Sequence, residues 1–238
     1  MDNLEDWDDG KMKLINLVEQ LRHHEHGELE ARFGTVENGR FKAGVTVNFF
    51  KKCLSMCESF KEWSSVSDWA IRKDFFFSNS TRVSMYTENQ ELKTIAVQKK
   101  KIKSITNKIE NNLTFDKSNV FPSGLRLSLS TENPTDYSEN ETPKLIRFKY
   151  TKQFFTLSGW SFDFSKTFTS DDFQNVMDSC ACLERFGNEE NQDFTYEIEI
   201  ELQKKTYLSL HSNEHISNSL IMKIFDFLLP IHKIKLLH

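Results

Sequence analysis

The feature that most constrains this chain is a segment in which glutamate alternates strictly with apolar residues. From Tyr196 to Leu202, one face of a β-strand would carry Glu197, Glu199 and Glu201, and the opposite face only apolar side chains. Residues on the same face are about 7 Å apart along a strand. Neighbouring glutamates would then repel by roughly 2 kcal/mol at an effective dielectric constant near 20. Such a strand is favourable only if cations lie over its acidic face.

Other segments alternate in the same way, and several supply the opposite charge. Glu28, Glu30 and Arg32 share a face against Leu29, Ala31 and Phe33. The other polar faces carry Arg126, Ser128, Ser130 and Glu132; Arg147 and Lys149; Asp163 and Ser165; Arg82; and two of the three lysines from Lys99 to Lys101. Ordinary antiparallel strands place mixed polar residues in water, whereas the charges here sort by sign from strand to strand.

The periodicity of the sequence predicts about eight strands and four helices. The strands are expected at residues 27–35, 70–77, 82–87, 92–102, 124–132, 145–156, 159–168 and 194–202, mostly with short antiparallel connections. The amphipathic helices are expected at residues 11–24, at 47–60, after Ser170 through Leu183, and from near Glu214 to Pro230.

Two barrel arrangements fit these elements. In one, the apolar faces line the interior and the charged faces lie outside, as in a lipocalin-like carrier of hydrophobic ligands. In the other, the charges line the lumen, and the apolar exterior is covered by the amphipathic helices. We favour the second, because the helices need an apolar surface to pack against. The predicted fold class is α+β, a closed antiparallel β-barrel with a charged lumen and helices outside, in a single domain over residues 1–238.

Composition excludes several other classes. The 31 Lys and Arg against 35 Asp and Glu give a net charge of −4, which does not favour wholesale binding of duplex nucleic acid. The sequence holds no stretch of about 18 apolar residues, so no membrane partner is expected. With 38% hydrophobic and 28% charged residues, the chain is expected to be a folded intracellular protein.

The charged lumen predicts phosphate chemistry. Glu-x-Glu strands offer the oxygen ligands that Mg²⁺ or Mn²⁺ prefers. Facing Arg and Lys side chains would hold a dense polyanion such as a triphosphate. The sequence shows neither a P-loop nor a Ser/His/Asp arrangement, so attack of water on phosphorus with the help of a metal is the simplest expected reaction.

The ordered series of these motifs resembles the triphosphate tunnel metalloenzymes. It is most similar to the metal-dependent RNA 5′-triphosphatases of mRNA capping in fungi, protists and large DNA viruses. The motifs that carry the resemblance are Glu28-x-Glu30-x-Arg32, Arg126-x-Ser128-x-Ser130-x-Glu132, Arg147-x-Lys149, Asp163-x-Ser165 and Glu197-x-Glu199-x-Glu201. They span residues 28 to 201, nearly the whole predicted barrel.

The resemblance implies a role for each matching residue. It implies metal contacts for Glu28, Glu30 and Glu201, and it places Glu197 and Glu199 on metal-bound or attacking water, with Glu199 the closer to metal. The phosphate-binding residues would be Arg82, Arg126, Arg147, Lys149 and one of Lys99 or Lys101. Glu132 would position the attacking water, Arg32 would pair with the acidic cluster, and Asp163 and Ser165 would orient basic residues.

One position departs from the family pattern. Relatives usually carry another basic residue two positions after the Arg-x-Lys pair, but this chain has Thr151 there, followed by Lys152. Either a bulge turns Lys152 inward or the third cation is missing.

The function that the resemblance implies is removal of the γ-phosphate from triphosphate-ended RNA, the first step of cap formation. A guanylyltransferase domain or partner would act next, and the chain could be the N-terminal domain of a longer capping enzyme. Its expected location is the nucleus, or the cytoplasm or virion of a viral system. The alternatives are an inorganic tripolyphosphatase or a nucleoside or thiamine triphosphatase on the same fold, and a non-catalytic binding barrel.

Overall fold

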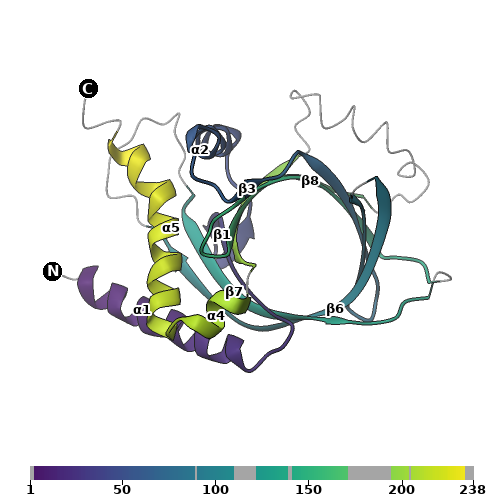
Figure 1. The fold of residues 1–238 in the computed structure, drawn as a ribbon, viewed down its shortest axis with the longest axis horizontal. Coiled ribbons are helices and arrows are strands. Elements are labelled where there is room, and N and C mark those ends of the chain that lie inside the picture. The colour runs from purple at the N-terminus through teal and green to yellow at the C-terminus, as the bar shows by residue number, and fades with distance from the viewer. Residues whose placement is uncertain are drawn as a thin grey trace.

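The computed structural model describes residues 3–88, 90–109, 122–138, 141–170, 194–203 and 205–233. The helix predicted after Ser170 lies outside these residues. Within them, eight strands close into an antiparallel barrel, which Figure 1 shows end-on as a ring. The barrel strands are β1 (Gly27–Glu37), β4 (Ala70–Phe76), β5 (Thr81–Glu88), β6 (Glu91–Lys108), β7 (Gly124–Pro134), β8 (Leu145–Phe155), β9 (Trp160–Ser170) and β10 (Thr195–Leu202).

The barrel closes because β1 pairs with a strand on each side. Its Glu28 lies opposite Ser130 of β7, and its Glu30 lies opposite Glu201 of β10. Going round the ring, β10 is followed by β9, β8, β4, β5, β6 and β7. The predicted closed barrel is therefore confirmed.

The strands differ from the predicted ones in detail. β6 continues to Lys108, beyond the predicted end at Ile102, through a register shift between Lys101 and Lys103. A bulge adds one residue to a strand and breaks the period of two, which is why the alternation is lost there in the sequence. Two short strands were not predicted: β2 (Arg40–Ala43) pairs with β1, and β3 (Ser65–Val66) pairs with β8. Asn38 and Gly39, both with positive φ, form the two-residue turn between β1 and β2.

Helices cover one side of the barrel (Figure 1). They are α1 (Asn3–Arg22), α2 (Val47–Ser59), α4 (Lys205–Leu210) and α5 (Asn213–Lys233). α2 begins where predicted, because the hydroxyl of Thr46 caps it by accepting a hydrogen bond from the amide of Phe49. α4 was not predicted, and α5 continues past the expected stop at Pro230 to Lys233.

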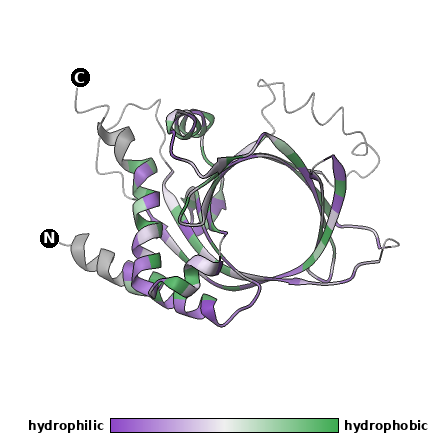
Figure 2. Cartoon of the chain, viewed as in Figure 1, coloured by the Kyte–Doolittle hydropathy of each residue, from purple (hydrophilic) through white to green (hydrophobic). Residues whose placement is uncertain are grey.

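The main core lies between the barrel wall and these helices. Leu29, Ala31 and Phe33 of β1 are buried there, against side chains of α1 and α5. The rings of Phe33 and Phe227 meet edge to face at 6.0 Å. Figure 2 shows hydrophobic and hydrophilic residues alternating along the strands. The apolar faces thus point away from the lumen, and those in the main core pack against the helices. The interpretation as a carrier with an apolar interior is therefore wrong.

Among the helices that the structure describes, none is long and apolar enough to cross a membrane.

Candidate active site

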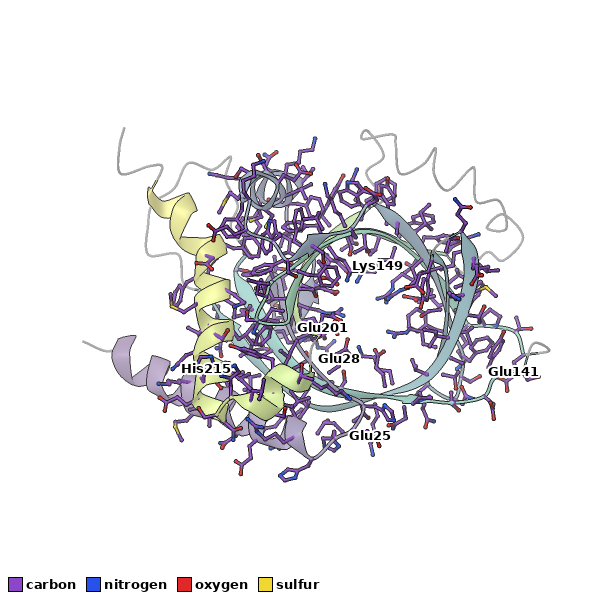
Figure 3. All side chains as sticks on the ribbon, in the orientation of Figure 1. Glu25, Glu28, Glu141, Lys149, Glu201 and His215 are labelled. Carbon is purple, nitrogen blue, oxygen red and sulfur yellow. The ribbon has the colours of Figure 1, made fainter. Side chains whose placement is uncertain are left out.

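The acidic wall of the lumen is built by β1 and β10. The register places Glu30 opposite Glu201 and Arg32 opposite Glu199. Because alternate residues of a strand share one face, Glu28 and Glu30 of β1 join Glu197, Glu199 and Glu201 of β10 on the same surface. Figure 3 shows Glu28 and Glu201 inside the ring with Lys149, whereas Glu25 and Glu141 lie outside it. The predicted glutamates are brought together.

Glu199 is the most strongly paired of these carboxylates. It is buried, and it lies 2.8 Å from the ammonium group of Lys149 and 3.0 Å from the guanidinium of Arg32. Arg32 also bonds Glu30 at 2.9 Å. Burial alone would raise the pKa of Glu199, but Arg32 and Lys149 outweigh burial and hold this pKa below the usual range. Glu199 is therefore a carboxylate that stays ionised.

A second network joins Glu28 to Glu132. Lys99 contacts both carboxylates and lies 2.9 Å from Glu132. Arg82 bonds Glu132 at 2.7 Å, and the hydroxyl of Ser130 donates to Glu28 at 2.9 Å. Of the two lysines proposed from the sequence, Lys99 thus belongs to the cluster. Lys101 of β6 lies opposite Ser130 of β7, but its side chain is exposed to solvent.

Glu201 and Glu197 lack such cations. Within the described residues, neither side chain makes an ion pair, and the buried Oε2 of Glu197 has no hydrogen-bond partner. Burial raises the pKa of Glu201 well above its usual range, and the carboxylates of Glu28 and Asp163 raise it further. Burial and the neighbouring Glu199 likewise raise the pKa of Glu197. The acidic wall is therefore short of positive charge at these two residues.

The donor set of this wall fits a hard divalent cation. Carboxylate oxygens are the preferred ligands of Mg²⁺ and Mn²⁺, and the shortage of positive charge at Glu201 is what such an ion would relieve. As the side chains stand, no three acidic, His or Cys residues of the described part are gathered tightly enough to hold a metal ion. Glu28 and Glu30 are instead held in ion pairs by Lys99 and Arg32. The carboxylates would have to exchange these cations for the metal.

The remaining predicted residues line the same lumen. The guanidinium of Arg126 lies 4.6 Å from the ring centre of Phe41, a cation–π contact, and Arg126 is opposite Arg32 in the register. Asp163 accepts a hydrogen bond from Gln153 at 2.8 Å. These contacts orient Arg126 and Asp163 but do not test the roles implied by the resemblance.

The structure resolves the question raised by Thr151 and Lys152. The pairing of β8 with β4 and β9 runs without a register shift, so Thr151 faces the lumen, where its hydroxyl lies 2.9 Å from that of Ser165. Lys152 points the other way and bonds Glu58 of α2 at 2.8 Å. No bulge turns Lys152 inward, and the third cation of this strand is missing.

One charged cluster, on β4, β5 and β8, was not predicted from the sequence. Asp74 is fully buried, with 0% of its surface exposed. Its carboxylate lies 3.0 Å from Arg72 and 2.8 Å from Arg147, and it accepts a hydrogen bond from Ser84 at 2.7 Å. The alternation of Arg72 and Asp74 in the predicted strand 70–77 is the signal that could have revealed this cluster.

Asp74 gives a prediction for acid stability. Burial raises its pKa, but Arg72 and Arg147 outweigh burial and hold this pKa below the usual range. A lowered pKa in the folded state contributes stability above the unfolded pKa, near 4, and this stability is lost as pH falls below it. The free energy of unfolding of Asp74→Asn should therefore lie well below that of the native chain at pH 6, and the gap should narrow at pH 3. Urea unfolding at both pH values measures it, and a gap that widens on acidification contradicts the prediction.

Comparison with known proteins supports the architecture. The chain matches no protein-family model, and a search of curated proteins finds no match. Among solved structures, the RNA triphosphatase Pct1 of S. pombe matches with a TM-score of 0.61 and 17% identity, over 94% of this chain and 91% of that one. The triphosphatase of the Mimivirus capping enzyme matches with a TM-score of 0.57 and 10% identity, over 92% of this chain and 96% of that one.

Within the described residues, the protein belongs to the class of closed eight-stranded barrels with a charged lumen and helices outside. The comparisons then show that this is the fold of the RNA triphosphatases, as the motifs predicted. Pct1 has also been solved in complex with the Spt5 CTD, and the Mimivirus domain comes from a trifunctional mRNA capping enzyme.

Proposed function

We propose that the chain is a divalent-metal-dependent RNA 5′-triphosphatase that releases the γ-phosphate of triphosphate-ended RNA. The observation that carries this proposal is the lumen itself, in which the glutamates of β1 and β10 lie with Lys149, Arg82 and Lys99 inside one closed barrel. Dense charge of both signs in a confined site suits a substrate that brings phosphate together with a cation.

Mg²⁺ or Mn²⁺ would be held by Glu28, Glu30 and Glu201, with Glu199 as a further ligand. Such an ion, when bound, offsets the charge on the phosphoryl oxygens. The supporting observations are the placement of Glu30 opposite Glu201 and the lack, within the described residues, of a cation on Glu201.

The cations of the lumen bind and orient the triphosphate. Lys149, Lys99 and Arg82 are already inside the barrel, and Arg126 and Arg147 extend the basic surface. Charge-assisted hydrogen bonds from fixed donors stabilise the charge that develops on the phosphate oxygens, and the barrel wall keeps bulk water away. Arg82 and Arg147 are held by Glu132 and Asp74 before the substrate arrives, so these two donors need little reorganisation during the reaction. Lys99 and Lys149 would instead leave Glu28 and Glu199 for the phosphate when the metal binds.

Glu197 and Glu132 suit different tasks. The buried Oε2 of Glu197 has no hydrogen-bond partner among the described residues, so it can accept a hydrogen bond from an attacking water. Glu132 holds Lys99 and Arg82, which outweigh the effect of burial and lower the pKa of this carboxyl. We assign Glu132 first to positioning these two cations. Its contact with the attacking water stays a prediction.

The substrate would be the 5′ end of nascent RNA, and the product, diphosphate-ended RNA, is the substrate that a guanylyltransferase domain or partner would require. This part of the proposal is supported by the capping enzymes that share the fold.

The test is release of γ-phosphate from triphosphate-ended RNA with Mg²⁺ or Mn²⁺, and with EDTA instead. We expect release that depends on the metal. Lys149→Ala should lose about 100-fold in rate, because removing one charge-stabilising donor costs about that much. Lys152→Ala is the control and should release phosphate normally, because the side chain of Lys152 bonds Glu58 outside the lumen.

Inorganic tripolyphosphate and ATP are assayed in parallel. Turnover of tripolyphosphate or ATP without turnover of RNA would replace the capping role by polyphosphate or nucleotide metabolism. No turnover of any of the three would leave a binding barrel.

A further inference from the structure

The cluster around Asp74 has no part in the function derived so far, apart from Arg147. Arg72 and Asp74 come from β4, Ser84 from β5 and Arg147 from β8, on three adjacent strands. Asp74 uses both oxygens: Oδ1 contacts Arg72 and accepts a hydrogen bond from Ser84, and Oδ2 accepts hydrogen bonds from Arg72 and Arg147. The carboxylate is thus saturated, and its three partners are fixed relative to one another.

The charge of the cluster is not balanced. Two guanidinium groups share one carboxylate, so the group carries a net positive charge on the lumen wall. Each guanidinium has five N–H donors. Arg72 places its Nε and Nη2 within 3.3 Å of Asp74, and Arg147 does the same with its Nε and Nη2. Both arginines therefore keep donors for another acceptor.

The cluster lies within electrostatic reach of the acidic wall. Burial lowers the pKa of Arg72, but Asp74 and, next, Glu199 outweigh burial and raise it. Arg147, after Arg32 and Lys149, also helps to lower the pKa of Glu199, and it opposes the rise that burial and Glu199 cause in the pKa of Glu197. The register adds a direct link, because Arg72 lies opposite Lys149, which bonds Glu199.

Stability alone gives no reason for this arrangement. Burying a carboxylate with two arginines generally contributes little net stability, and apolar side chains of similar volume often do as well or better. What such a cluster does provide is two guanidinium groups held at a fixed spacing, a geometry that suits phosphate oxygens.

We propose that Arg72 and Arg147, positioned by Asp74, form a polyphosphate-binding subsite on the β4–β8 wall, facing the carboxylates of β1 and β10. The inference rests on the proposed function and deepens it, because it assigns Arg72 as a substrate contact and Asp74 as a positioning residue. The subsite takes a phosphate of the triphosphate chain, and its second guanidinium compensates for the cation that is missing at Thr151.

The test is binding of inorganic tripolyphosphate to the whole chain in EDTA, measured by calorimetry, so that no turnover is needed. We expect Arg72→Gln to weaken binding about 10-fold and Arg72→Lys to weaken it less, because lysine keeps the charge without the planar fork. Asp74→Asn should weaken it by a similar factor. The matched control is Lys73→Gln on the same strand, whose ammonium lies over the Phe148 ring outside the lumen, and it should bind normally.

Enzyme kinetics separate the loss of a substrate contact from a defect in folding. In Arg72→Gln, KM for the triphosphate substrate should rise about 10-fold, while kcat changes less than about 3-fold. Affinity within 2-fold of the native value in Arg72→Gln overturns the subsite, even if the chain is an active triphosphatase. Lack of binding by the native chain also overturns it. The native chain could also bind tripolyphosphate, lose this binding in Arg72→Gln, and hydrolyse no triphosphate. That result would support the subsite and reject the proposed function. If Asp74→Asn fails to fold, binding by Arg72→Gln and Arg72→Lys decides whether the subsite exists.

Discussion

Glu201→Gln is expected to abolish metal-dependent phosphate release, by about 1000-fold or more, and yet to stabilise the metal-free protein. Glu201 lies opposite Glu30, and among the described residues no cation pairs with it. Its charge is therefore a cost to the fold until a divalent ion arrives. Glutamine keeps the shape of the side chain, removes the repulsion from Glu28 and Asp163, and loses the anionic ligand.

The two effects are measured separately. Phosphate release reports the loss of activity, and thermal unfolding in EDTA should show a melting temperature a few degrees higher, since 1 kcal/mol corresponds to about 2–4 °C at this chain length. The rise in melting temperature that Mg²⁺ or Mn²⁺ produces in the native chain should disappear. Glu25→Gln is the control, because Glu25 is exposed outside the barrel (Figure 3). A variant that loses stability in EDTA would show that the charge of Glu201 is compensated in the metal-free protein. A variant that keeps its response to metal would show that Glu201 is not a ligand.

Glu199→Gln is expected to remove activity as completely but to destabilise the protein. Glu199 shares the face of β10 with Glu201, two residues away, but it forms ion pairs with Lys149 and Arg32. Removing its charge leaves the buried ammonium group of Lys149 without its carboxylate. Breaking a buried ion pair in this way costs roughly 3–5 kcal/mol, so the melting temperature should fall by about 10 °C.

The comparison of the two variants is the informative measurement. Both carry the same change of one glutamate to glutamine on one face of one strand, and the expected shifts in melting temperature have opposite signs. Equal shifts would mean that the cations of the lumen are shared evenly over the acidic wall and that the ion pairs of Glu199 are not specific. Urea unfolding in EDTA provides an independent measure of the same difference.

Much of the barrel could be predicted because residues close together in the sequence decide which face of a strand each side chain occupies. A period of two assigns each residue of Glu28–Phe33 or Tyr196–Leu202 to a face, and the need of the amphipathic helices for an apolar surface indicates which face points outward. The prediction weakened where the period broke, at the register shift of β6 after Lys101. It also left out the hairpin at Asn38 and Gly39, although that dipeptide is itself a strong turn signal.

Asp74 and Lys152 show why the site was harder to predict than the fold. The sequence places Arg72 and Asp74 on one face of the predicted strand 70–77, but it does not reveal Arg147. This residue is 73 positions from Asp74 and meets it only through the pairing of β4 with β8. Lys152 is adjacent to a lumen position, and only the unbroken register of β8 decides that it faces α2.

The sequence by itself determined which side chains share a face, the signs of their charges and the class of chemistry that they suit. These properties depend on spacing along one strand. The tertiary structure alone decided the partners: Lys149 and Arg32 neutralise Glu199, Lys99 joins Glu28 to Glu132, and Glu201 has no cation among the described residues. The physical reason is that an ion pair depends on distance in space, and closing the barrel brings strands together that are far apart in the chain.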